Sequence, residues 1–137
     1  MLPHPTLATH YPSTDAKPAF VNRLFDRGAP HYDAVVGWGF LHSGASYRRR
    51  TLRDHGLRAP QHLLDVACGT GLVAVEAAKI LGTAENITCL DASAGMLAVA
   101  RTKLSAHFVL GRAEQLPFAD HSFDFLTMGY ALRHVTS

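Results

Sequence analysis

The sequence has few cysteines, no long apolar run and little net charge, and each shortage excludes a class of protein. Only Cys68 and Cys89 occur among the 137 residues, too few for a disulfide framework or a zinc cluster. No apolar stretch approaches the roughly 20 residues needed to span a bilayer. Residues 1–17 contain three prolines and no apolar core of a secretory signal. We therefore expect a cytoplasmic protein with one packed domain.

The charge of the chain is small but unevenly placed. The formal net charge of +2 at pH 7 indicates no nucleic-acid partner. Residues 1–60 carry eight Lys/Arg against four Asp/Glu, whereas residues 61–137 carry five against seven. The basic excess is concentrated between Arg48 and Arg58, which is either a solvated helix face or a surface for peripheral contact with anionic lipid or an anionic substrate tail. The nine histidines show no ligand spacing, so we predict no metal site.

Composition and periodicity divide the chain into three parts. Residues 1–18 are rich in Pro, His and Thr and predict a flexible arm. Residues 19–60 predict a helical cap, with a first helix stopped by Gly28, a short segment after Pro30 and a helix over Ser43–His55. Residues 61–137 predict half of a cofactor-binding domain, because the pattern changes after Pro60 to strands that alternate with helices.

The alternation in residues 61–137 indicates the fold class. Strands are expected at Leu63–Ala67, Asn86–Leu90, His107–Leu110 and Phe123–Met128. Helices are expected at Leu72–Leu81 and at Ala94–Leu104, the second one capped by Ser93. This arrangement is typical of βαβ units. We predict an α/β protein with a Rossmann-like, doubly wound parallel sheet of about four strands behind an N-terminal helical front.

The strongest chemical signal lies where the first predicted strand meets a helix. Residues 64–71 have the sequence LDVACGTG. Glycines suit this position because the turn is tight and a ligand must approach the backbone closely. Asp91 follows Gly71 by twenty residues, at the end of the next strand. A carboxylate there can accept hydrogen bonds from both ribose hydroxyls of an adenosine, so loop and acid together predict an adenosine-containing cofactor.

Two cofactors fit these residues. The segment from Gly69 to Ala74 matches Gly-x-Gly-x-x-Ala, a permitted dinucleotide pattern, so an NAD-dependent oxidoreductase is one alternative. Asp65 favours the other alternative, because a carboxylate near the loop suits the ammonium and sulfonium charges of S-adenosyl-L-methionine (SAM) better than a pyrophosphate. Asp65 could equally serve the structure by accepting hydrogen bonds from backbone N–H groups of the loop. A further alternative is a non-catalytic cofactor-binding fragment.

Four segments resemble those of the ubiquinone/menaquinone biosynthesis C-methyltransferases, a family of class I SAM-dependent methyltransferases. LDVACGTG at 64–71 resembles the glycine loop of motif I, and LDASAGML at 90–97 resembles the family's D-S-x-x-M-L segment. GRAEQLPF at 111–118, SFD at 122–124 and ALRHV at 131–135 resemble its GDAE-LPF, SFD and LRNV run. LFD and HYD within residues 24–33 resemble its N-terminal FD and YD signature.

The resemblance implies a SAM-dependent methyltransferase (EC 2.1.1.-), with S-adenosyl-L-homocysteine (SAH) as product. It places cofactor-binding residues on the N-terminal front and at the ends of the strands: Tyr32, Asp65, Ala67, Gly69, Thr70, Gly71, Asp91, Ala92, Met96, Arg112, Ala113, Glu114 and Met128. Gly69 and Gly71 would face the methionine part, and Tyr32 would close over the cofactor. Arg112 stands where the family has an aspartate, and an arginine cannot accept a hydrogen bond from the adenine amino group.

The resemblance also implies C-methylation of a quinol or a related phenolic small molecule. Such a ring must lose a phenolic proton to become electron-rich, and His134, Tyr130 and His31 are the candidate bases. The family's sheet has seven strands, so we expect the C-terminal half to be missing and this chain to be a fragment. The edge of the fourth strand would then be exposed, which would allow a homo-oligomer to form through it.

Overall fold

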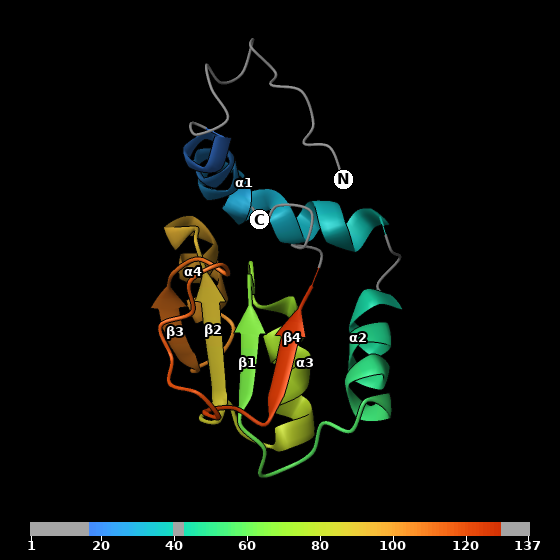
Figure 1. The fold of residues 1–137 in the computed structure, drawn as a ribbon. Coiled ribbons are helices and arrows are strands. Elements are labelled where there is room, and N and C mark those ends of the chain that lie inside the picture. Colours follow the sequence, from blue (N-terminus) through green and yellow to red (C-terminus); the bar gives the residue numbers. More distant parts are fainter. Residues whose placement is uncertain (1–16, 40–42, 130–137) are drawn as a thin grey trace, which may run out of the picture.

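The computed structural model describes residues 17–39 and 43–129 (Figure 1). Its elements follow one another as α1 (Lys17–Gly39), α2 (Ser43–Asp54), β1 (Leu63–Val66), α3 (Leu72–Leu81), β2 (Ile87–Asp91), α4 (Ala94–Arg101), β3 (His107–Leu110) and β4 (Phe125–Met128). The predicted arm lies almost entirely outside the described residues, as do Tyr130 and His134.

All four strands form one parallel sheet in the order β3-β2-β1-β4. This order confirms the predicted Rossmann-like α/β fold. β1 lies inside the sheet and all four of its residues are buried, as expected of a strand covered on both faces. From β1 the chain adds β2 and β3 on one side and then returns to add β4 on the other side. The order of strand addition therefore reverses at β1, which makes it the topological switch point. Open α/β sheets bind ligands at the carboxyl ends of the strands beside such a point.

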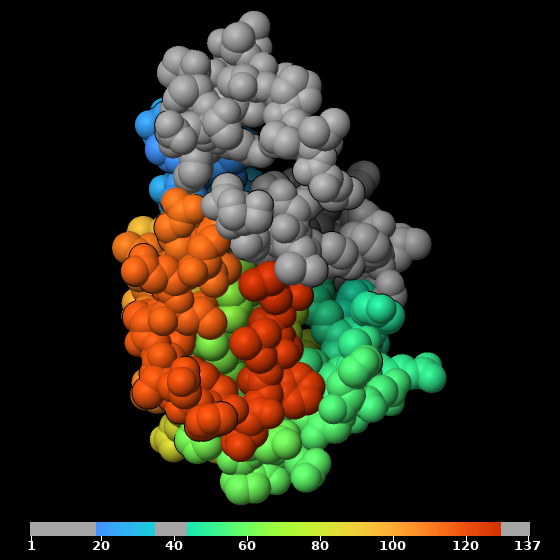
Figure 2. All heavy atoms as spheres, viewed as in Figure 1, coloured from blue at the N-terminus to red at the C-terminus, as the bar shows by residue number. Residues whose placement is uncertain are grey.

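The two faces of the sheet are covered differently in the described part of the chain. The helix face carries Leu63, Ile87 and Cys89, which pack against Ala74 and Ala77 of α3 and their neighbours. The opposite, loop face carries Leu64, Val66 and Leu90, which pack against Phe118 and Phe123 from the segment between β3 and β4. Figure 2 shows this segment, in orange and red, on the face turned to the viewer. The main core therefore lies between the sheet and its helices.

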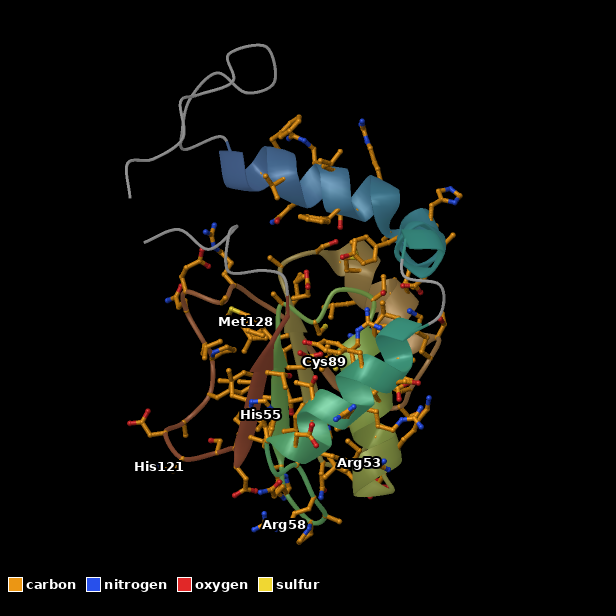
Figure 3. All side chains as sticks on the ribbon, turned by 90° about the vertical axis from the view of Figure 1, so that its right-hand side faces the viewer. Arg53, His55, Arg58, Cys89, His121 and Met128 are labelled. Atoms are coloured by element: carbon orange, nitrogen blue, oxygen red, sulfur yellow. The ribbon has the colours of Figure 1, made fainter. Side chains whose placement is uncertain are left out.

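The first helix differs from its prediction. The sequence predicts that Gly28 ends it, but α1 continues through Gly28 and Pro30 to Gly39. Proline in a helix removes one hydrogen bond and bends the axis, and Figure 3 shows α1 changing direction along its length. Contacts on both sides of Pro30 offset this cost: Asp26 binds the start of α4 and Asp33 binds the loop after β1. Tertiary contacts therefore override the local stop signals.

A buried ion-pair network attaches α2 to α3. Glu76 is 3% exposed, yet its carboxylate contacts two cations. Arg49 Nε lies 2.6 Å from one oxygen and Lys79 Nζ lies 2.7 Å from the other. Arg49 of the predicted basic segment therefore pairs with a buried carboxylate. Removing Arg49 would leave the buried charge of Glu76 with one partner fewer.

The remaining boundaries agree with prediction to within a few residues. α3 and β3 match their expected ranges, and the Ser93 side chain caps α4 by accepting a hydrogen bond from Met96 N. β4 begins at Phe125 rather than Phe123, because the Phe123 ring packs edge-on against Phe118 in the preceding segment, 5.1 Å between centroids. No helix among the described residues is long and apolar enough to cross a membrane.

Candidate functional site

The carboxyl ends of the four strands meet beneath α1, which crosses above them in Figure 1. The loop after β1 turns sharply there, since Ala67, Gly69 and Gly71 have φ values of 52°, 57° and 80°. A Cβ on Gly69 would meet nothing within 4 Å, so the backbone borders open space that a ligand can enter. A Cβ on Gly71 would lie 3.2 Å from Ala100 Cβ of α4. Gly69 therefore faces the candidate site, and Gly71 allows close packing of α4.

Asp91 connects this loop with the turn after β2. One carboxylate oxygen accepts a hydrogen bond from Gly69 N at 2.8 Å, and the other accepts one from Ser93 N at 2.9 Å. Burial raises the pKa of Asp91, although these backbone hydrogen bonds favour the charged form. A carboxylate has about four acceptor sites, so Asp91 can still accept from a ligand hydroxyl. The predicted pairing of glycine loop and acid is thus a direct contact.

Asp65 supplies a second carboxylate beneath the loop. It is 1% exposed, and one of its oxygens accepts a hydrogen bond from Thr127 Oγ1 of β4 at 2.8 Å. Its other oxygen, Oδ2, is buried and has no hydrogen-bond partner among the described residues. Burial raises the pKa of Asp65 to about 7, and the nearby charge of Asp91 acts in the same direction. A positively charged ligand would favour the ionised form of this group.

Two aspartates of α1 reach the site from above. Asp33 accepts a hydrogen bond from Thr70 Oγ1 of the glycine loop, and Asp26 accepts from Ser93 Oγ at the start of α4. Lys103, just after α4, donates to Asp33 and to the Thr70 carbonyl. Hydrogen bonds from Ser93 and Gly95 lower the pKa of Asp26, so it is charged at neutral pH.

Asp26, Asp33, Lys103 and Thr127 are not among the predicted site residues. The two aspartates belong to the FD and YD segments of the resemblance, and their spacing of seven residues places both on one side of a helix after two turns. Nothing in the local sequence pairs Lys103 or Thr127 with a partner so distant along the chain.

The other predicted cofactor residues occupy different environments. Tyr32 is half-buried beside Asp33 on α1, and Ala92 is half-buried between Asp91 and Ser93. Met96 is 2% exposed and belongs to the buried side of α4. Ala113 and Met128 pack on the loop face.

The segment after β3 places two predicted residues in contact with each other. The Arg112 guanidinium donates two hydrogen bonds to the Glu114 carboxylate, with Nη2 and Oε1 3.1 Å apart. The Arg112 side chain is 49% exposed. Of the candidate bases, His31 is exposed on α1, and Tyr130 and His134 lie outside the described residues. The roles of all these residues stay predictions.

Comparison with curated proteins shows a consistent relationship. The chain is 37% identical over 134 residues to a demethylmenaquinone methyltransferase of Symbiobacterium thermophilum, covering 92% of this chain and 53% of the relative. It is 34% identical over 119 residues to one of Staphylococcus aureus, covering 84% of this chain and 49% of the relative. The chain thus spans about half the length of these relatives.

Solved structures share the fold. The YcgJ protein of Bacillus subtilis superposes with a TM-score of 0.58 at 28% identity, covering 67% of this chain and 41% of that one. The DhpI–SAH complex superposes with a TM-score of 0.62 at 24% identity, covering 78% of this chain and 50% of that one. At such identity the second likeness speaks for the fold alone.

The family assignment comes from a match over most of the sequence. The model of the ubiE/COQ5 methyltransferase family matches residues 13–137. This range includes the glycine loop, Asp91 and both aspartates of α1, and it agrees with the predicted resemblance. The chain therefore belongs to the ubiE/COQ5 methyltransferase family.

Proposed function

We propose that this chain binds SAM at the carboxyl ends of β1 and β2 and belongs to a SAM-dependent methyltransferase (EC 2.1.1.-). One observation carries the proposal: the open backbone of Gly69 donates to Asp91, and the Asp65 carboxylate of the same β1 end has an oxygen with no hydrogen-bond partner among the described residues. When bound, SAM supplies an electrophilic methyl group on a sulfonium.

The two carboxylates bind different parts of the cofactor in this proposal. Asp91 accepts hydrogen bonds from the ribose hydroxyls, because it is held by backbone N–H groups and retains lone pairs. Asp65 favours the positive charges of the methionine part, since its burial makes an isolated negative charge costly. A pyrophosphate would meet the Asp65 carboxylate with the wrong sign of charge, which argues against NAD, whereas Asp91 suits the ribose of either cofactor.

We take the methyl acceptor to be a carbon of a quinol or related phenolic ring. The support is the curated relatives' description as demethylmenaquinone methyltransferases. Methyl transfer depends mainly on alignment of acceptor and cofactor in a dry pocket. Before transfer, a base would remove a phenolic proton to make the ring carbon nucleophilic, and the proton on that carbon would be lost afterwards to restore the aromatic ring. The candidate bases are His134, Tyr130 and the exposed His31 of α1.

Contact with a membrane surface would suit an acceptor that carries an apolar tail. Arg53 and Arg58 are exposed at and after the end of α2, and Figure 3 labels them with His55 in the lower part of the molecule, away from α1. Arginines near an anionic bilayer are each worth about 1 kcal/mol. Sedimentation with vesicles containing phosphatidylglycerol checks this: replacing both arginines by glutamine should weaken binding about thirtyfold, and unchanged sedimentation would refute it.

Self-association is proposed through β4, which is an edge strand of the described sheet. An unpaired edge presents free N–H and C=O groups to a second copy. Sedimentation velocity should show a dimer that dissociates on dilution, and a monomer at every concentration would remove this proposal.

Isotope transfer tests the function itself. The chain is incubated with methyl-labelled SAM and a reduced demethylated naphthoquinol, and the product is analysed by mass spectrometry. Where the chain transfers the label, we expect it on a ring carbon, and none with a Gly69→Val variant. Label on oxygen would contradict C-methylation, and label on a non-phenolic acceptor in place of the naphthoquinol would contradict the proposed acceptor class.

A further inference from the structure

Thr70 of the glycine loop is enclosed by two charged groups from distant parts of the chain. It is 1% exposed, and its hydroxyl donates to Asp33 Oδ1 of α1 at 2.5 Å. Lys103 Nζ donates to the Thr70 carbonyl oxygen at 2.8 Å and also to Asp33. Both the side chain and the backbone of Thr70 are therefore fixed by a single ion pair.

The same helix contacts the second turn of the site. Asp26 Oδ1 accepts hydrogen bonds from Ser93 Oγ at 2.5 Å and from Gly95 N at 2.9 Å. A Cβ on Gly95 would lie 2.9 Å from Asp26 Cα, so α1 and the start of α4 approach as closely as two backbones can. α1 thus contacts the turns that follow both β1 and β2.

The position of Thr70 gives these contacts a consequence for ligand binding. Thr70 lies between Gly69 and Gly71, which both have left-handed backbone conformations. Glycine populates positive and negative φ about equally, so these residues do not fix the loop conformation by themselves. A loop of this kind loses much conformational entropy when it is ordered. The hydrogen bond to Asp33 orders it before a ligand arrives, and Gly69 N is then directed at Asp91.

We propose that Asp33 is a positioning residue of the cofactor site: through Thr70 and Lys103 it holds the glycine loop in its binding conformation, and so couples the docking of α1 to cofactor affinity. The proposal deepens the proposed function and rests on it. Asp33 acts through Thr70 and need not touch the cofactor.

Calorimetric titration with SAH of matched variants tests the coupling. Asp33→Ala and Thr70→Val each remove the hydrogen bond and should weaken SAH binding about tenfold, the size expected of a charge-assisted hydrogen bond. Thr70→Ser keeps the hydroxyl and should bind within about twofold of the native chain. The double variant should be no weaker than Asp33→Ala alone, because Asp33→Ala already removes the hydrogen bond that Thr70→Val removes.

A control separates positioning from loss of stability. Arg49→Met breaks the attachment of α2 to α3, so it should lower the melting temperature without changing SAH affinity. If Arg49→Met weakens SAH as much as Asp33→Ala, or if Asp33→Ala binds SAH like the native chain, the positioning role is refuted.

Amide hydrogen exchange tests the proposal without any cofactor. Asp33→Ala should speed exchange at residues 67–71 of the free protein while leaving β1 and β2 protected, whereas Arg49→Met should not. Unchanged exchange in the loop would overturn the positioning role even where SAH binds. If the native chain fails to bind SAH, the proposed function is refuted. Faster loop exchange in Asp33→Ala would in that case still show that Asp33 orders the glycine loop.

Discussion

The carboxyl edge of the sheet has two unlike halves. At β1 and β2, the polar groups of both turns are bound by carboxylates, and α1 lies over them. At β4 and the segment before it, Arg112 and Glu114 pair at the surface. Apolar side chains are also exposed along this segment and β4, with Leu116 at 40% and Leu126, nearer the amino end of β4, at 57%. Within the described residues, one half is assembled for a ligand and the other is open.

The two halves of the carboxyl edge are therefore expected to differ in their effect on cofactor binding. Ordered polar groups fixed before binding are what a cofactor site needs, because little is then lost on binding. An exposed apolar face needs further contacts before it can enclose a small molecule. Substitutions in the β1–β2 half should therefore change cofactor affinity strongly, and those in the β4 half weakly.

The largest effect is expected from Gly69→Val. A branched side chain would occupy the open space beside the loop at a φ of 57°, which valine avoids. SAH affinity measured by calorimetry should fall by about a hundredfold or more, equivalent to roughly 3 kcal/mol. Gly82→Val is the matched control, because Gly82 has a similar φ of 76° and open surroundings but lies at the far end of α3. Equal losses in both variants would assign the effect to strain alone.

Asp65 should give the next largest effect, on stability. Its pKa in the folded chain is raised to about 7, above the ordinary value of 3.8. Between these values the folded protein holds a proton that the unfolded chain has released, so the free energy of unfolding falls as the pH rises. The slope approaches about 1.4 kcal/mol per pH unit.

Urea unfolding between about pH 5 and pH 8 measures this slope. The curve of Asp65→Asn should lack this contribution, so its stability relative to the native chain should rise with pH. Parallel curves for the two proteins would show that Asp65 is ionised throughout, and would remove the argument from its buried, unpartnered oxygen.

Asp91→Asn should weaken SAH binding about tenfold, because an amide is a poorer acceptor for ribose hydroxyls than a carboxylate. Asp124 gives a control of the same kind: its carboxylate also accepts from a backbone N–H, that of His62, but at the opposite edge of the sheet. Asp124→Asn should keep the native SAH affinity in the same titration. A loss confined to Asp124→Asn would contradict the placement of the site.

The smallest effect is expected in the open half. Arg112→Met should leave SAH affinity within about twofold, because Arg112 pairs with Glu114 at the surface. Arg112→Asp introduces an acceptor for the adenine amino group and should tighten binding about threefold, the gain of one modest hydrogen bond. Fluorescence competition with SAH measures both. A tenfold loss of SAH affinity in Arg112→Met would contradict the expectation that substitutions in the β4 half have weak effects.

The sequence predicts the elements best where local signals and tertiary contacts agree. The Ser93 side chain caps α4 by accepting from a backbone N–H within the first turn of the helix. Gly82 ends α3 because glycine adopts the left-handed backbone conformation of a helix C-cap. The glycine loop and Asp91 are likewise predictable, since each follows its strand directly. Gly28 and Pro30 mislead, because the two carboxylates of α1 hold the helix together from outside.

The contacts that complete the site lie beyond local sequence. Asp65 meets Thr127 across 62 positions, and Asp33 meets Thr70 across 37. Each pair depends on the strand order and on where α1 crosses the sheet. Asp65 Oδ2 has no hydrogen-bond partner within residues 17–39 and 43–129 because of that packing, and no periodicity in the sequence predicts it.

Calorimetric titration of the native chain with SAH, with NAD as the parallel ligand, tests whether the carboxyl ends of β1 and β2 form a SAM site. We expect saturable binding of SAH at one site per chain and no heat from NAD. Binding of NAD in place of SAH, or SAH binding that Gly69→Val leaves intact, would contradict a SAM site at the carboxyl ends of β1 and β2.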